Sequence, residues 1–272
     1  MPQIINTNIS SLNAQRNLDT SQGSLFTALQ RLSSGLRVNS SKDDAAGLAV
    51  AEKMNAQARG MTVAIRNAND GISLAQVAEA GMNVIGEHLQ RMRELAVQAA
   101  SGQWDSDNRS ALDTEYQHLK SEIDRVISAT NFNGQKLLDG TFSDGVIFQV
   151  GPSSTEESQI LVEISPVSVD TAAITGTDGL NALSELSALD AAIDSINNNR
   201  ASLGAIQNRF EGVLTQLAAA RESTEAARSR IMDADYASET AKLARAQVLQ
   251  QAGVAMLAQA NALPQNVLRL LQ

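Results

Sequence analysis

The C-terminal stretch LQQAGVAMLAQANALPQNVLRLLQ, residues 249–272, places apolar side chains three and four positions apart along its whole length. The positions are Leu249, Ala252, Met256, Ala260, Leu263, Val267 and Leu270. This spacing is the period of a helix with one apolar face. Chain ends are usually polar and frayed, and Arg269 is the only charged residue in this stretch. The pattern therefore predicts a helix whose face is buried against another element.

The N-terminal segment carries a matching apolar pattern. Its members are Ile5, Ile9, Leu12, Leu18, Leu25, Leu29, Leu32 and Leu36. Steps of three, four and seven put these side chains on one helical face. Asn39-Ser40-Ser41 then offers a break and a cap, and we expect Asp43 and Asp44 in the first turn of the next helix. Heptad spacing at both ends predicts that the two ends pair as a coiled coil.

The middle of the chain reads as long helices around one small β element. Apolar stripes over 65–99, 112–126 and 189–217 predict three helices, and the first continues through Asn69-Asp70-Gly71. Residues 146–150 and 160–164 are rich in β-branched side chains and predict a hairpin. Residues 166–185 show no clear period. The expected fold is mainly α, a long antiparallel bundle with a small β-hairpin and paired terminal helices.

Composition excludes several function classes. The chain has 272 residues, no Cys, 3% aromatic residues and a net charge of −9. An acidic chain lacks the clustered Lys and Arg that nucleic acids require. No window approaches the roughly 20 apolar residues that would span a bilayer, so we expect no membrane insertion. The N-terminus lacks the pattern of a secretory signal, so we expect export, if it occurs, by a route that reads no cleaved signal peptide.

No residue pattern indicates a catalytic, cofactor or metal site. The two histidines, His88 and His118, lack the partner spacing of a zinc protease. Asp43-Asp44 and Asp233/Asp235 do not match a calcium loop, and we interpret them as caps and ion-pair partners. There is no phosphate-binding glycine loop and no nucleophile elbow. We therefore expect a protein that is not an enzyme and needs no cofactor.

The segment QRMREL, residues 90–95, combines charged and apolar side chains on one helix. Met92 and Ala96 fall on the apolar stripe, which places Arg91, Glu94 and Leu95 on the remaining faces. An exposed Leu between charged residues usually has no function. A solvated helix face is thus the simplest interpretation of these residues taken alone.

Several longer motifs resemble bacterial flagellin. They are RLSSGLR (31–37), SKDDAAG (41–47), RNANDGIS (66–73), QRMRELAVQAA (90–100), NFNGQKLLDG (131–140), SRIMDADYASETAKLARAQVLQQAG (229–253) and LAQANALPQNVLRLLQ (257–272). The resemblance covers roughly residues 1–150 and 190–272, with the motifs in the same order and at the same ends of the chain. It implies a structural subunit that polymerises into the bacterial flagellar filament for motility.

The resemblance also implies a domain organisation. Residues 1–42 and 236–272 would pair as the coiled coil of the inner tube, which folds on polymerisation. Residues 43–235 would form the helical core domain, with its β-hairpin at about 136–165. No outer variable domain would be present, because residues 165–190 leave room only for a connection. Two alternatives remain open, a hook–filament junction protein and a secreted membrane-interacting translocator, although basic polar faces typical of membrane-binding helices are missing.

Partners and site residues follow from the same resemblance. The assembly residues would be Leu29, Leu32, Leu36, Leu249, Met256, Leu263, Val267 and Leu270. Arg91, Leu95 and Glu115 match positions contacted by the animal innate immune receptor for flagellin. Other implied partners are copies of the same chain, an export chaperone at the C-terminus, and the filament cap and hook-junction proteins. The implied location is the extracellular filament, reached without a cleaved signal peptide.

Overall fold

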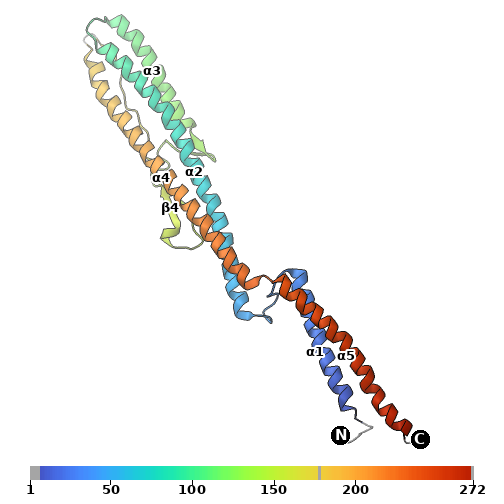
Figure 1. The fold of residues 1–272 in the computed structure, drawn as a ribbon. Coiled ribbons are helices and arrows are strands. Elements are labelled where there is room, and N and C mark those ends of the chain that lie inside the picture. Colours follow the sequence, from blue (N-terminus) through green and yellow to red (C-terminus); the bar gives the residue numbers. More distant parts are fainter. Residues whose placement is uncertain (1–6, 177–178, 271–272) are drawn as a thin grey trace. The chain divides into compact units, whose positions relative to one another are not determined.

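The computed structural model describes residues 7–176 and 179–270, except for the side chains of 263–270. Its elements are α1 (Ile9–Ser34), α2 (Ala45–Ala100), α3 (Ser106–Ala129), β1 (Asn131–Phe132), β2 (Gln135–Lys136), β3 (Val146–Gln149), η1 (Glu156–Ser158), β4 (Gln159–Val162), α4 (Leu180–Met232) and α5 (Tyr236–Leu270). They form two units (Figure 1). Unit 1 comprises Met1–Ala56 and Ser223–Gln272, and unit 2 comprises Gln57–Glu222. The expected mainly-α fold with a small β-hairpin is confirmed.

Unit 1 is built on the terminal helices α1 and α5, which lie side by side (Figure 1). The side chain of Asn8 caps α1 by accepting a hydrogen bond from the backbone N–H of Ser11. Gly35 ends α1 in the left-handed region, with φ of 71°, which costs glycine little because it has no Cβ. The predicted pairing of the two chain ends is therefore present.

A short joint follows α1 and precedes α5. The backbone N–H of Arg37 donates to the carbonyl of Met232 at 2.6 Å, and the Arg37 guanidinium donates to the carbonyl of Ile231. Val38, Ala51 and Met232 form a small apolar cluster beside these bonds. The carbonyls at the end of α4 thus find donors, as exposed C-terminal carbonyls of a helix require.

The start of α2 differs from the expectation for Asp43 and Asp44. We expected both in the first helical turn, but α2 begins at Ala45. Asp44 is the cap, because its carboxylate accepts from the N–H of Gly47 at 2.8 Å. Asp43 instead accepts from the N–H groups of Asn39 and Ser40, which lowers its pKa. Asp44 thus satisfies a first-turn N–H that has no helical carbonyl to bind, whereas Asp43 binds donors that precede the helix.

Unit 2 packs α2, α3 and α4 around one apolar core. The core includes Met82, Ile85, Leu89 and Met92 of α2, each fully buried. At Gly71 the helix lies so close to Phe210 of α4 that an added Cβ would meet the ring at 2.5 Å. The Phe210 ring also contacts Phe148 edge-on, with centroids 5.7 Å apart. The helix continues through Asn69-Asp70-Gly71, as predicted, because this glycine serves close packing.

The β elements of unit 2 are two small antiparallel pairs. The predicted hairpin is present as β3 and β4, with Val146 opposite Val162 and Ile147 opposite Leu161. A second pair, β1 with β2, follows α3 and turns at Asn133 and Gly134, which both have positive φ. Each of these strands is two residues long, which is too short to give a strand pattern in the sequence.

An extended segment, residues 163–176, runs over unit 2 between the hairpin and α4; we call it the strap. Its side chains alternate, with Val167, Val169 and Thr171 buried and Ser168 and Asp170 exposed. This is the burial pattern of a strand, although no strand pairs with it among the residues described. We expected only a connection here, because polar and small residues in the outward positions obscure the alternation.

Side chains of α3 hold the strap by its backbone. The buried Arg109 guanidinium donates to the carbonyls of Gly176 in the strap and of Ala99 and Ser101 at the end of α2. Lys120 donates to the carbonyl of Thr171, and Asp113 accepts from the N–H of Ile174. The strap thereby gains hydrogen bonds that a sheet would otherwise supply.

We predict that Gly71→Ala lowers the stability of unit 2 by about 1–2 kcal/mol. Forcing a methyl group against Phe210 costs about 1–3 kcal/mol, and the better helix propensity of Ala offsets up to about 1. The measurement is chemical unfolding followed by fluorescence of Trp104, which lies in unit 2.

The matched control is Gly86→Ala, at another glycine inside α2. An added Cβ there meets its nearest neighbour, Ile196, at an ordinary 3.9 Å. We therefore expect Gly86→Ala to raise stability by up to about 1 kcal/mol. Equal effects of the two substitutions would contradict the close packing at Gly71.

Candidate assembly surface

The seam between α1 and α5 consists of small side chains. Apart from Glu239 of α5, the buried residues among the described side chains of this pair are small: Ser11, Ser21 and Ala28 on α1 and Ala246 and Ala260 on α5. At Gly253 of α5, an added Cβ would lie 3.2 Å from the side chain of Leu18. Small side chains let two helix backbones approach closely, but they bury little apolar area. The seam thus sets how closely the two helices approach each other, but it contributes little to the stability of the pair.

Polar contacts tie the same two helices at both ends. The side-chain amide of Asn8 donates to the carbonyl of Ala260 at 2.7 Å, and the hydroxyl of Ser11 donates to Asn261 at 2.8 Å. Near the joint, the carboxylate of Glu239 bonds Arg31 at 3.4 Å and Lys242 at 2.8 Å. Because these bonds have specific partners, they fix the register of α1 against α5.

The larger apolar side chains of the terminal helices remain exposed. They are Ile9, Leu12, Phe26 and Leu29 on α1 and Val248, Leu249, Val254 and Met256 on α5. Exposed fractions reach 64% at Ile9 and 63% at Met256. Heptad patterning led us to expect the apolar stripes of the two terminal helices to pack against each other. The structure shows instead that the helices pair through small residues and leave many of the larger ones unburied.

The expected assembly residues fall into three groups. Leu29, Leu249 and Met256 are exposed, whereas Leu32 and Leu36 are half-buried. Leu263, Val267 and Leu270 belong to α5, but their side chains lie outside the described residues. Sequence reasoning passed over Phe26, Val248 and Val254, because they fall beside the regular stripe.

A groove of about 1220 Å³ follows the α1–α5 pair. From α1 it is lined by hydroxyl and amide side chains such as Asn13, Asn17 and Thr20. From α5 it is lined by Leu249, Met256 and the basic Arg245. Its two walls differ in chemistry, since only the α5 wall offers large apolar side chains.

Arg91 and Glu115 lie together on the surface of unit 2. Their side chains form an ion pair at 2.8 Å, and Arg91 also bonds Glu94 at 2.9 Å. These two carboxylates raise the pKa of Arg91, first through the hydrogen bond to Glu94. The structure therefore brings two of the three expected receptor-contact residues side by side.

Leu95 does not share this exposure. Its side chain is 1% exposed and belongs to the core of unit 2. Our placement of Leu95 on an open face of the helix was wrong. The reason is that α2 buries a wider face than a single stripe, as Leu95 and Ala96 are both buried beside Met92.

The described residues contain no group of three or more His, Cys, Asp or Glu side chains that could hold a metal ion. Within residues 7–176 and 179–270, no helix is long and apolar enough to cross a membrane. Buried ionisable side chains such as Arg109 and Glu239 serve packing and pairing.

Two family models match the chain at its two ends. Residues 5–143 match the bacterial flagellin N-terminal helical region, and residues 186–271 match the bacterial flagellin C-terminal helical region. The matched ranges include both α1 and α5 together with most of unit 2. The match thus spans far more than half of the sequence.

Similar proteins carry the same description. The flagellin of Halalkalibacterium halodurans is 45% identical and aligns with 99% of this chain and 100% of its own length. The flagellin of Bacillus subtilis is 39% identical over 98% of this chain and 99% of its own. The flagellar filament 33 kDa core protein of Treponema phagedenis is 39% identical over 99% of this chain and all of its own.

Other comparisons bear on chain length and fold. The alignment with flagellin A of Vibrio anguillarum runs over 376 positions at 34% identity, so that relative contains segments that this chain of 272 residues lacks. A solved structure of a flagellar hook-associated protein from Vibrio parahaemolyticus has a TM-score of 0.61 and covers 70% of this chain. At 13% identity it shows a shared fold alone.

The exposed apolar side chains of the terminal helices and the family matches at both ends of the chain agree with one another. A polymerising subunit needs surfaces that other copies can bury, and it needs no reaction centre. The chain belongs to the bacterial flagellin family, as a short form, and is a structural subunit of the extracellular flagellar filament.

Proposed function

We propose that the α1–α5 pair is the part of this subunit that drives polymerisation. The observation that carries the proposal is the exposure of Leu12, Phe26, Leu29, Leu249 and Met256 around a seam of small residues. Burying such side chains is favourable by roughly 25 cal/mol per Å2 of apolar surface. Within one chain this free energy is not gained, so it is available for association.

The occupant of these surfaces is proposed to be the same pair in neighbouring copies. Contacts between different faces of identical chains build open helical filaments. In this arrangement residues 1–42 and 236–272 form the inner tube, and residues 43–235 form the helical core around it. Leu32, Leu36, Leu263, Val267 and Leu270 join the assembly set on the strength of the flagellin pattern.

Further partners belong to the same proposal. An unpaired apolar C-terminal stripe needs cover before assembly, which an export chaperone at the C-terminus would provide. The filament cap and the hook-junction proteins would meet the subunit at the two ends of the filament. Export without a cleaved signal peptide is part of this proposal, because the resemblance to flagellin implies it.

A second proposed partner is the animal innate immune receptor for flagellin. Arg91 and Glu115 support it as an exposed, mutually paired patch on unit 2. Leu95 would act from beneath by supporting the helix, because its side chain is buried. This binding would be incidental to the filament role.

We predict that Leu249→Asp prevents filament growth, because a carboxylate would have to be buried against apolar neighbours. Leu249→Met, which keeps an apolar side chain of similar size, should assemble normally. The measurement is electron microscopy of purified chain seeded with filament fragments. Unchanged Trp104 fluorescence would show that unit 2 stays folded, and long filaments from Leu249→Asp would contradict the proposal.

Glu239 gives a pH-dependent prediction for the α1–α5 pair. Its pKa is lowered from the ordinary 4.5, first by the hydrogen bond from Lys242 and also by Arg31. A lowered pKa in the folded state adds stability that is complete above the ordinary pKa and is lost as the pH falls through the lowered one. Glu239→Gln should therefore weaken the pair at neutral pH by about 1 kcal/mol, and have no effect in strong acid.

Hydrogen exchange of the amides of α1 measures this difference. About 1 kcal/mol corresponds to roughly fivefold faster exchange at pH 7. The control is Asp19→Asn, which neutralises an exposed carboxylate of α1 that forms no ion pair within the described part of the chain. A pH-independent effect of Glu239→Gln would rule out the proposed ion-pair contribution.

The receptor proposal predicts that Arg91→Ala and Glu115→Ala each reduce receptor activation by about tenfold, the loss typical of a central interface residue. Arg93→Ala is the matched control, since Arg93 is an equally exposed arginine of α2 paired with Asp190 at 2.6 Å. Dose–response curves of depolymerised protein on receptor-expressing reporter cells give the result. Equal activity of Arg91→Ala and the unmodified chain would refute the assignment.

A further inference from the structure

The outer face of the β3–β4 hairpin is apolar in its centre. Ile147 and Leu161 lie directly opposite each other in the register, and their side chains are 60% and 44% exposed. Their inward neighbours, Ile160 and Val162, are buried in the core. Single exposed apolar residues are ordinary, but a cross-strand pair forms a continuous contact surface.

Carboxylates surround this apolar pair. Residues 137–165 contain Asp139, Asp144, Glu156, Glu157 and Glu163 and no Lys or Arg. Glu163 directly follows β4 on the same outward side as Leu161, and Glu156 and Glu157 lie in η1, directly before the other end of β4. Only Asp139 has an ion-pair partner, Lys136, among the described residues. The hairpin is therefore an acidic rim around an apolar centre.

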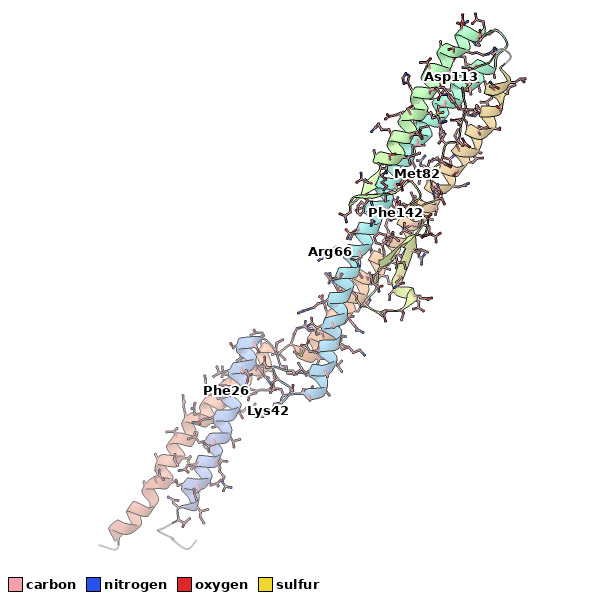
Figure 2. The ribbon with its side chains drawn as sticks, turned by 180° about the vertical axis from the view of Figure 1, so that it is seen from behind. Phe26, Lys42, Arg66, Met82, Asp113 and Phe142 are labelled. Carbon is pink, nitrogen blue, oxygen red and sulfur yellow. The ribbon has the colours of Figure 1, made fainter. Side chains whose placement is uncertain are left out.

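One face of α2 carries positively charged side chains on both sides of an exposed apolar residue, Val63. Arg59, Val63 and Arg66 are all exposed, at positions that share one face of the helix. Residues 57–69 contain these two arginines and no carboxylate. Neither arginine forms an ion pair in the part of the chain that the structure describes. We call these three residues the basic ridge (Figure 2 labels Arg66).

The basic ridge does not face the hairpin of its own chain. The face of α2 that meets the hairpin contains Gly60, which approaches Pro152, and Asn67, whose amide donates to the carbonyl of Gln149 at 2.9 Å. Successive helical residues are about 100° apart, which puts the ridge roughly a quarter-turn away from that face. Both surfaces are therefore open to another molecule.

We propose that the hairpin of one copy, through Ile147, Leu161, Glu156 and Glu163, docks on the basic ridge of the next copy. The inference rests on self-polymerisation and assigns a contact to unit 2 within it. The two surfaces match in their apolar centres and in the signs of their charges. Because they are different faces of the same chain, the contact is heterologous and repeats along a filament.

Charge complementarity also offsets the electrostatic repulsion between copies of the chain. Each chain carries a net charge of −9, so copies repel one another unless local contacts bring opposite charges together. Most of the surface of a neighbouring copy, being negatively charged, would repel the acidic rim. The basic ridge offers it two arginines that have no partner of their own.

The test is a charge swap between copies. One variant, Arg59→Glu with Arg66→Glu, makes the ridge acidic, and the other, Glu156→Arg with Glu163→Arg, places positive charges at the two rim positions proposed to meet the ridge. Each variant alone then opposes like charges, and we expect at least a tenfold drop in the rate of seeded filament growth. An equimolar mixture restores growth, because acidic ridges meet the rims with introduced arginines and basic ridges meet the unchanged acidic rims. Electron microscopy and light scattering follow assembly.

The matched control is Arg209→Glu, which reverses an exposed arginine of α4 outside both surfaces and should leave growth unchanged. Circular dichroism checks that every variant is folded. The proposal is overturned if either double variant grows filaments like the unmodified chain, or if the mixture fails to recover growth. Failure of the unmodified chain to form filaments would instead count against polymerisation itself, which separates the two claims.

Discussion

The close approach of α1 and α5 over small side chains is the constraint on which the rest of unit 1 depends. Because Ser11, Ser21 and Ala28 are the buried positions of α1 in the seam, larger side chains such as Leu12, Leu29 and Leu249 remain exposed. A seam of leucines would bury the large apolar side chains within each chain and leave little apolar surface to drive association. The weak internal seam thus keeps apolar surface available for neighbouring copies.

Unit 2, by contrast with unit 1, buries its apolar residues within one chain. Phe210 fits against Gly71, and the strap covers the core with alternating side chains. Arg109 adds three carbonyl contacts from the end of α2 and the strap. Under the proposed assembly, such a unit would fold before polymerisation, whereas the α1–α5 pair would gain most of its stability from other copies.

The sequence predicted much of the fold and less of the surface. Regular spacing located α2, α3 and α5, and β-branched residues located β3 and β4, because period and composition directly reflect burial. The face through which α1 and α5 pair could not be predicted, since small residues give no periodic signal. Leu95 was misplaced for a related reason, as the width of a buried face depends on how many neighbours a helix has. The strap was missed because its contacts come from α3, far away in the sequence.

The way the strap is held has a consequence for variation among related proteins. The side chains of Arg109 and Lys120 donate hydrogen bonds to backbone carbonyls of the strap. A backbone carbonyl is present whatever side chain its residue carries. Outward positions such as Ser168 and Asp170 can therefore change without loss of these contacts. The outward surface of the strap and the hydrogen bonds that hold it in place therefore depend on different atoms, so that the sequence of this surface can vary while the helices beneath it stay the same.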